Sequence, residues 1–218
     1  AQMTQLERLE IVDSPLPQLD FLKSLTRLKR LHIRGSREPS GNFSDLSTLA
    51  GLTRMEDLYL YLDVISDLSG LSAMSQLESL VLTGNTNITD LSPLAGLTNL
   101  QTLEVPVGGE NVGTGSNVTD LSPLSGLTEL RELDLTYGGY SASDSQEYDS
   151  LAPLASLTNL TSLTIRNSKI SDLTPLSGLT KLRALTIHNG AAIQDLSPLA
   201  RLPELKSLTI RGARHELD

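Results

Sequence analysis

Residue types that usually carry catalysis or bind metals are scarce in this chain of 218 residues. There is no cysteine, which excludes disulfides, thiolate chemistry and cysteine-based zinc sites. The three histidines are His32, His188 and His215. His32 lies too far along the chain to share a site with the other two, and no pattern of carboxylates accompanies those. We therefore expect no catalytic site, no metal site and no enzyme activity.

Two further segments could bind small ligands but lack the required spacing. Gly113 and Gly115 are not followed by the third glycine of a dinucleotide-binding fingerprint, so we expect no cofactor. The acidic segment 144–149 could offer carboxylates to Ca²⁺, but it lacks the alternating aspartates of a dedicated calcium loop. Whether this segment binds a cation stays open.

Composition narrows the class of partner. The chain has 26 acidic and 17 basic residues, a formal net charge of −9, which argues against nucleic-acid binding. No segment approaches the ~20 consecutive apolar residues of a membrane span, so we expect no membrane insertion. Hydrophobic residues make up 39% of the chain and aromatic residues only 3%, which predicts an aliphatic core.

A repeated phrase organises the whole chain. Its core, Leu-x-x-Leu-x-Leu, recurs at intervals of 22, 27, 22, 23, 30, 30, 22 and 23 residues. The first positions of these nine cores are Leu6, Leu28, Met55, Leu77, Leu100, Leu130, Leu160, Leu182 and Leu205. Nine turns fill the sequence, so residues 1–218 form a single domain of stacked units.

Each unit combines a strand with a short helical turn. Leu163-Thr164-Ile165 alternates apolar and polar residues, which predicts a half-buried strand. The phrase Asp-Leu-Ser-Pro-Leu starts a helical turn, because Asp or Ser can accept backbone N–H bonds there and Pro is tolerated. One unit cannot bury its own leucines, so the units must stack.

The pattern resembles the leucine-rich-repeat family, and its 22-residue period is most similar to the bacterial internalin-type subclass. The resemblance implies a right-handed α/β solenoid, with a parallel β-sheet on the concave face and short 3-10 turns and loops on the convex face. The family places Asn shortly after each strand, and only Asn85 fits that rule here. No polar capping unit is visible at either end. We therefore expect a fragment of a longer protein, or a domain capped by a partner or a second copy.

Three insertions interrupt the period, at residues 35–41, 106–117 and 136–149. The two longer ones fall on consecutive turns, so they should emerge side by side from one rim. Neutral loop drift would explain them, because surface insertions cost little closure entropy. Their composition favours a functional patch instead. The last insertion carries Tyr137, Tyr140 and Tyr148, and Tyr is over-represented in binding surfaces.

The outward strand positions supply the other candidates. Tyr59 and Tyr61 lie there, so none of the five tyrosines is expected in the core. Residues 23–37 contain six basic and no acidic residues, whereas residues 104–149 carry a net charge of −8, which predicts a bipolar surface. The candidate partner-binding residues are Arg30, His32, Arg34, Tyr59, Tyr61, Val81, Glu104, Glu132, Asp134, Tyr137, Tyr140 and Tyr148.

The leading hypothesis is a non-catalytic module that binds another protein through the concave face and the adjacent rim loops. The resemblance implies display on a bacterial surface or secretion, which we favour over the cytoplasm. A ligand-sensing segment of a larger intracellular nucleotide-binding signalling protein and a structural spacer remain alternatives. End-to-end self-association through the uncapped ends is a further alternative for the partner.

Overall fold

The computed structural model describes residues 3–13, 19–35, 46–62, 65–85, 88–105, 118–136, 148–166, 170–188, 190 and 192–212. Within these residues, nine strands form one sheet in sequence order, and every neighbouring pair is parallel. The strands β1 to β9 are Arg8–Val12, Arg30–Arg34, Asp57–Tyr61, Ser79–Val81, Thr102–Glu104, Glu132–Leu135, Ser162–Arg166, Ala184–His188 and Ser207–Arg211. The fold is the solenoid of stacked units that the resemblance implies.

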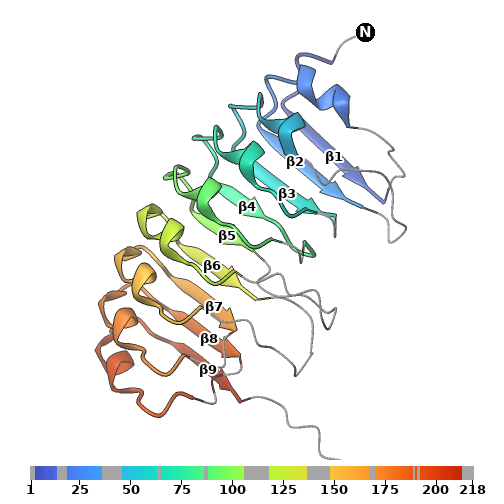
Figure 1. Cartoon of the computed structure of the whole chain (residues 1–218). Coiled ribbons are helices and arrows are strands. Elements are labelled where there is room, and N and C mark those ends of the chain that lie inside the picture. The colour runs from blue at the N-terminus through green and yellow to red at the C-terminus, as the bar shows by residue number, and fades with distance from the viewer. Residues whose placement is uncertain are drawn as a thin grey trace, which may run out of the picture.

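A short 3-10 helix follows each of the first eight strands. The helices η1 to η8 are Asp20–Ser24, Leu46–Leu49, Ser69–Leu71, Ser92–Leu94, Ser122–Gly126, Ala152–Ser156, Thr174–Gly178 and Ser197–Arg201. Figure 1 shows the strands along one side of a curved stack and the helices along the other. Among the described residues, no helix is long and apolar enough to cross a membrane.

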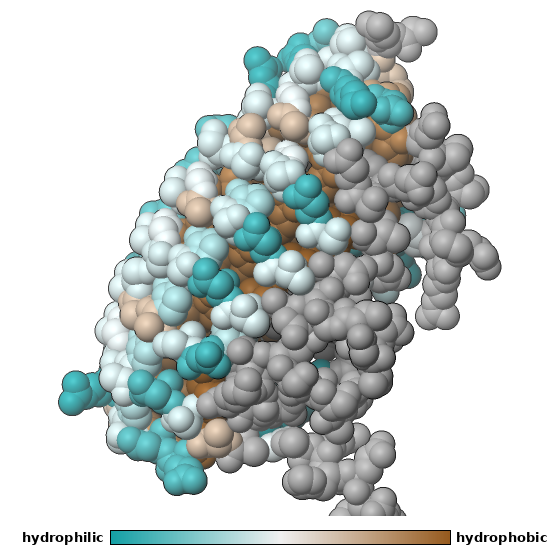
Figure 2. All heavy atoms as spheres, viewed as in Figure 1, coloured by the Kyte–Doolittle hydropathy of each residue, from teal (hydrophilic) through white to brown (hydrophobic). Residues whose placement is uncertain are grey.

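Aliphatic side chains fill the space between the sheet and the helices in one continuous core. In β7, Leu163 and Ile165 are fully buried, while Ser162, Thr164 and Arg166 are half-buried on the outward face. The same alternation recurs along the sheet because the register aligns equivalent residues of successive coils. Figure 2 shows hydrophobic residues in a strip along the stack, beside polar residues of successive coils.

The Asp-Leu-Ser-Pro-Leu phrase starts the helical turns as predicted. The Asp120 carboxylate accepts hydrogen bonds from the Ser122 backbone N–H at 2.7 Å and from its hydroxyl at 2.8 Å. Asp172 accepts the backbone N–H of Thr174 in the same way. Such bonds satisfy a donor that the first turn of a helix leaves free, and they favour the charged carboxylate.

Two kinds of asparagine tie neighbouring coils together at opposite ends of the strands. Asn85, the residue that fits the family rule, is fully buried, and its amide donates to the carbonyls of Leu60 and Leu82 at 2.8 and 2.9 Å. Its side-chain oxygen accepts the Ile65 N–H at 3.3 Å. Before the next strand, exposed Asn99 donates to the Ser75 carbonyl at 2.8 Å, a bond that the sequence analysis did not foresee.

The buried amide of Asn85 should matter far more than the exposed one. Asn85→Ala removes the side-chain partners of the Leu60 carbonyl and the Ile65 N–H, and each buried group left unpaired costs roughly 1–3 kcal/mol. We expect the free energy of unfolding, measured by urea denaturation, to fall by about 3 kcal/mol. Asn99→Ala is the control and should cost less than about 1 kcal/mol, because water can reach the freed carbonyl. Equal losses in the two variants would contradict this account of Asn85.

The aspartates that start the helical turns predict acid sensitivity. Hydrogen bonds from Ser122, Thr174 and Ser197 hold the pKa of Asp120, Asp172 and Asp195 below the ordinary value of 3.8. The unfolded chain therefore takes up protons first, so this stabilisation is complete above pH 3.8 and is lost as the pH falls through the lower folded pKa values.

The triple variant Asp120→Asn, Asp172→Asn, Asp195→Asn should therefore lose less stability than the unaltered chain between pH 5 and pH 3. The measurement is the urea midpoint at each pH. Asp20→Asn is an exposed control, because the Asp20 carboxylate pairs with Lys23 rather than with the backbone. An unchanged pH dependence in the triple variant would exclude the proposed role of these carboxylates.

Candidate functional site

Three rows of outward side chains run across the sheet, perpendicular to the strands, because the parallel register places equivalent residues side by side. Neighbouring strands lie about 4.8 Å apart, so neighbours in a row are within reach of each other. The first row is Arg8, Arg30, Asp57, Ser79, Thr102, Glu132, Ser162, Ala184 and Ser207. The middle row is Glu10, His32, Tyr59, Val81, Glu104, Asp134, Thr164, Thr186 and Thr209. The third row holds Val12, Arg34 and Tyr61 on β1–β3 and Arg166, His188 and Arg211 on β7–β9.

The structure brings nine of the twelve predicted candidates onto this face. They come from β2 to β6, and each is exposed or half-buried. They are Arg30, His32, Arg34, Tyr59, Tyr61, Val81, Glu104, Glu132 and Asp134. We call this set the recognition surface.

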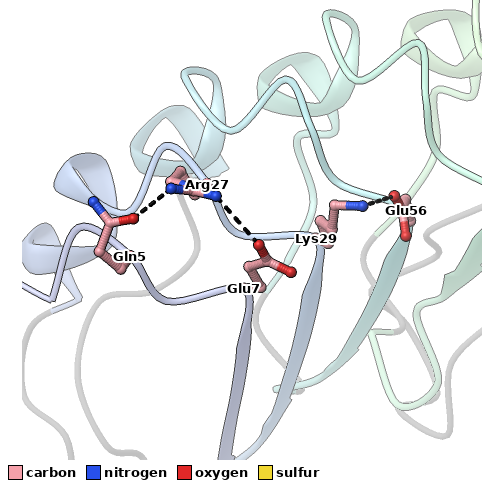
Figure 3. Close-up of polar contacts among 5 residues, drawn as sticks. All are labelled: Gln5, Glu7, Arg27, Lys29 and Glu56. Atoms are coloured by element: carbon pink, nitrogen blue, oxygen red, sulfur yellow. Dashed lines mark hydrogen bonds and ion pairs between the residues drawn. The ribbon is translucent and has the colours of Figure 1, made fainter.

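Carboxylates offset the basic residues at the N-terminal end, which reduces the predicted bipolarity. Arg30 pairs with Asp57 at 2.8 Å and Arg34 lies 3.8 Å from Asp13. At the strand starts, Arg27 lies 3.5 Å from Glu7 and contacts Gln5 (Figure 3). The partners come from other coils, which the linear window of residues 23–37 did not contain. The N-terminal end is therefore less positive than predicted.

Lys29 and Glu56 form a further cross-coil pair beside this group, with 2.7 Å between the ammonium nitrogen and the carboxylate oxygen (Figure 3). The hydrogen bond and the charge of Glu56 raise the pKa of Lys29 above its ordinary value. Lys23 pairs with Asp20 at the same distance. Exposed pairs of this kind contribute little to stability, so their main effect is to neutralise the surface.

Aromatic rings meet between β2 and β3. His32 and Tyr59 are register partners, and their ring centroids lie 4.1 Å apart at an interplanar angle of 60°. Nδ1 of His32 is 3.7 Å from the Glu10 carboxylate, while its Nε2 is buried without a hydrogen-bond partner among the described residues. Tyr61 and Val81 lie beside this pair, so the rings and the valine form a partly apolar patch.

Carboxylates gather on β5 and β6, and we call Glu104, Glu132 and Asp134 the acidic centre. Glu104 and Asp134 are register partners. The Thr83 hydroxyl donates to Glu104 at 2.6 Å, and the Thr136 N–H donates to Asp134 at 2.8 Å. Within the described part of the chain, no basic side chain pairs with any of the three. Like charges on directly opposite residues destabilise a sheet, so the acidic centre opposes folding.

Tyr148 is not part of the surface. The sequence analysis placed it in the rim insertion with an exposed ring, but its side chain is 2% exposed and belongs to the core. It takes the buried position that Val118 and Ile170 occupy in neighbouring coils, and its hydroxyl donates to the Arg166 carbonyl at 3.5 Å. The expectations that no tyrosine is buried and that Tyr148 contacts a partner are wrong.

The position of Tyr148 could have been found from the sequence. The buried residue stands two positions before the aspartate that starts each helical turn, as Val118 stands before Asp120. In this coil Ser150 replaces the aspartate, and its hydroxyl accepts the Ala152 N–H at 3.0 Å. The substitution hides the phrase and makes Tyr148 look like a loop residue.

Other candidates fall outside the described residues. These are Tyr137, Tyr140, the whole of segment 106–117 and most of segments 35–41 and 136–149. In the part of the chain that the structure describes, no group of three or more His, Cys, Asp or Glu side chains is arranged to hold a metal ion.

The third row ends in a cationic series that is not among the twelve candidate residues. Arg166, His188 and Arg211 are register partners on β7, β8 and β9. Burial, followed by the charges of Arg211 and Arg166, lowers the pKa of His188, and the more distant charge of Asp134 opposes this. The outward charge thus changes sign between β6 and β9.

Comparisons with known proteins agree with the repeat fold. The family model for R13L1/DRL21 leucine-rich repeats matches residues 110–213. The crystal structure of internalin C2 from Listeria monocytogenes is similar, with 30% sequence identity and a TM-score of 0.78 over 95% of this chain and 81% of that one. Internalin InlF of the same organism has 28% identity and a TM-score of 0.67 over 95% of this chain.

More distant structures share the fold alone. The functional domain of InlJ from Listeria monocytogenes, which includes a cysteine ladder, has 21% identity and a TM-score of 0.68 over 99% of this chain. This chain spans 61% of the InlF chain and 46% of the InlJ chain. None of the curated protein sequences matches.

Tyr148 and Tyr61 offer a matched test of the revised assignment. Tyr148→Ala should lower the free energy of unfolding by about 3–5 kcal/mol, because it empties a closed core position. Tyr61→Ala should lower it by less than about 1 kcal/mol, because its ring is half-exposed. Urea denaturation of both variants provides the comparison. A small loss for Tyr148→Ala would show that its ring does not support the core.

Proposed function

Because this chain belongs to the internalin-like leucine-rich-repeat family, we propose that it is a non-catalytic module that recognises a partner protein. The partner lies against the outward rows of the sheet, on the recognition surface. The resemblance to internalins favours a place on a bacterial surface or in the secreted fraction, where such a module would meet proteins of other cells.

The observation that carries the proposal is the acidic centre. Glu104 and Asp134 lie side by side on neighbouring strands. An alternation of Arg and Glu at these outward positions would keep the same fold and remove the repulsion, as Arg30 and Asp57 do on β2 and β3. The repulsion between Glu104 and Asp134 is therefore unfavourable in the free protein, and basic side chains of a partner are the groups that would neutralise it.

The aromatic patch gives the surface its apolar component. Tyr59 is in the row of Glu104, separated from it by Val81. Tyrosine presents a rigid ring and a hydrogen-bonding tip, and buried tyrosines next to charged groups are frequent hot spots of interfaces. The preferred partner segment has apolar side chains over β2–β4 and basic side chains over β5–β6.

The test needs an identified partner. A photo-crosslinking residue at position 81 should capture a protein from extracts of cells that live in the same environment as the source organism of this chain. The same residue at position 95, in place of Ala95 on the helical side, should not capture that protein. The captured protein is then purified and its affinity for the unaltered chain is measured by calorimetry.

Charge-neutral and aromatic variants then locate the contact. We expect Tyr59→Ala with Tyr61→Ala to weaken binding by at least about 10-fold, which corresponds to roughly 1.4 kcal/mol. Glu104→Gln with Asp134→Asn should also weaken binding and reduce its salt dependence. Glu78→Gln, at an exposed position before β4, is the control and should change affinity less than about 2-fold. Equal affinity of all variants would show that the captured protein does not contact the recognition surface, and would overturn the proposal.

A further inference from the structure

The cationic series at the far end of the third row is a second feature of the outward face. We call Arg166, His188 and Arg211 the basic ladder. Each belongs to a different strand, and the register sets them side by side on β7, β8 and β9. With strands about 4.8 Å apart, the ladder spans about 10 Å along the stack.

The outward residues beside the basic ladder are small, mostly polar and not negatively charged. The outward positions of β7, β8 and β9 hold nine residues, and none is Asp or Glu. Apart from the ladder they are Ser162, Ala184, Ser207, Thr164, Thr186 and Thr209. The Thr186 and Thr209 hydroxyls adjoin His188 and Arg211 along their strands, and hydroxyls donate hydrogen bonds to oxyanions.

At the N-terminal end of the sheet, by contrast, acidic side chains pair with the basic ones. There Arg8 lies 3.6 Å from Glu10, and Arg30 and Arg34 also have carboxylate partners. On β9, Arg211 has no ion-pair partner among the described residues. Arg166 makes further contacts of its own, so the argument rests on His188 and Arg211.

Charged groups face His188 from three neighbouring strands. Burial is the largest influence that favours the neutral imidazole. The charges of Arg211 on β9 and then Arg166 on β7 add to it, and Asp134 on β6 acts against them. The pKa of His188 is therefore lowered first by burial and then by the positive charges beside it. An anion placed on the ladder would reverse this effect and favour the imidazolium.

We propose that the basic ladder, with the Thr186 and Thr209 hydroxyls, binds carboxylates of an acidic polypeptide segment. The inference rests on the proposed function, because the segment belongs to a protein partner on the same face. It adds a second contact of opposite sign, about two strands beyond the acidic centre. A partner with basic residues followed by acidic residues would then lie on the sheet in one direction only. The short span favours two or three carboxylates over a long polyanion, which the net charge of −9 also disfavours.

The test uses a hexaglutamate peptide as the probe and the side-chain proton resonances of His188 as the reporter. His188→Gln assigns those resonances among the three histidines. We expect saturable binding near pH 6.5 at low salt, with the pKa of His188 raised by at least about one unit in the complex. No change in the His188 resonances on saturation with the peptide would overturn the proposal.

Three matched variants locate the bound peptide. Arg211→Gln should weaken binding at least about 5-fold, and Arg211→Lys should retain most of the affinity. Lys206→Gln removes the same charge from the residue before β9, away from the outward rows, and should change affinity less than 2-fold. Circular dichroism confirms that each variant is folded. Equal losses in Arg211→Gln and Lys206→Gln would show that net charge, not the ladder, attracts the peptide.

Inorganic phosphate at matched ionic strength separates a peptide site from a general anion site. The peptide should shift His188 at concentrations where phosphate does not. An equal shift by phosphate would overturn the assignment to an acidic segment. None of these measurements needs the natural partner. They can therefore contradict the proposal for the basic ladder without contradicting the proposal for the recognition surface. Conversely, if the Tyr59 and Tyr61 variants lose the captured partner protein but still bind the peptide, the basic ladder stands independently of the recognition surface.

Discussion

A single coil of this chain cannot bury its own aliphatic side chains, and that constraint governs the whole molecule. The same strand position shows the effect at two places in the stack. Leu163 on β7 has a strand on either side and is fully buried, whereas Leu208 on β9, at the edge of the described sheet, is 42% exposed. Each coil is thus stabilised mainly by its neighbours.

A coil that departs from the repeated sequence is accommodated by a local change of residue. At Gly70, where the five later coils have Pro, an added Cβ would lie only 2.2 Å from the Leu46 carbonyl oxygen.

In-register stacking also decides how the surface is built. Every outward residue lies beside its equivalents in the next coils, so charges form rows rather than scattered points. On β1–β3 these rows combine opposite charges, as at Arg30 and Asp57. On β5 and β6 they combine like charges, as at Glu104 and Asp134. Exposed pairs are worth little to folding and like-charge neighbours are unfavourable, so stability does not explain the difference between the two regions.

The repeated leucine phrase was sufficient to predict the stacked coils, the strand positions and the carboxylates that start most of the helical turns, because these features recur along the chain. Predictions that depended on one coil alone were less secure. Tyr148 was assigned to the surface because Ser150 replaces the aspartate that marks its position. The ion pairs of the basic residues 23–37 were not predicted, because their acidic partners lie in other coils and therefore outside that segment of the sequence. Arg30 and Asp57 are 27 positions apart in sequence but neighbours in the sheet, and the register that predicted the rows already contained that contact.

Because the buried positions of the strands carry the stacking of the coils, the outward strand positions could vary without loss of the fold, and their composition therefore reports on other requirements. An arrangement chosen for stability would interleave Arg and Glu along each row. This chain instead keeps three carboxylates on β5 and β6 and none among the outward residues of β7–β9. Asp134 influences His188 only weakly, so the two groups of charge do not neutralise each other. Like charges gathered within each group repel one another in the free protein, and both groups are compensated when a ligand presents the complementary pair.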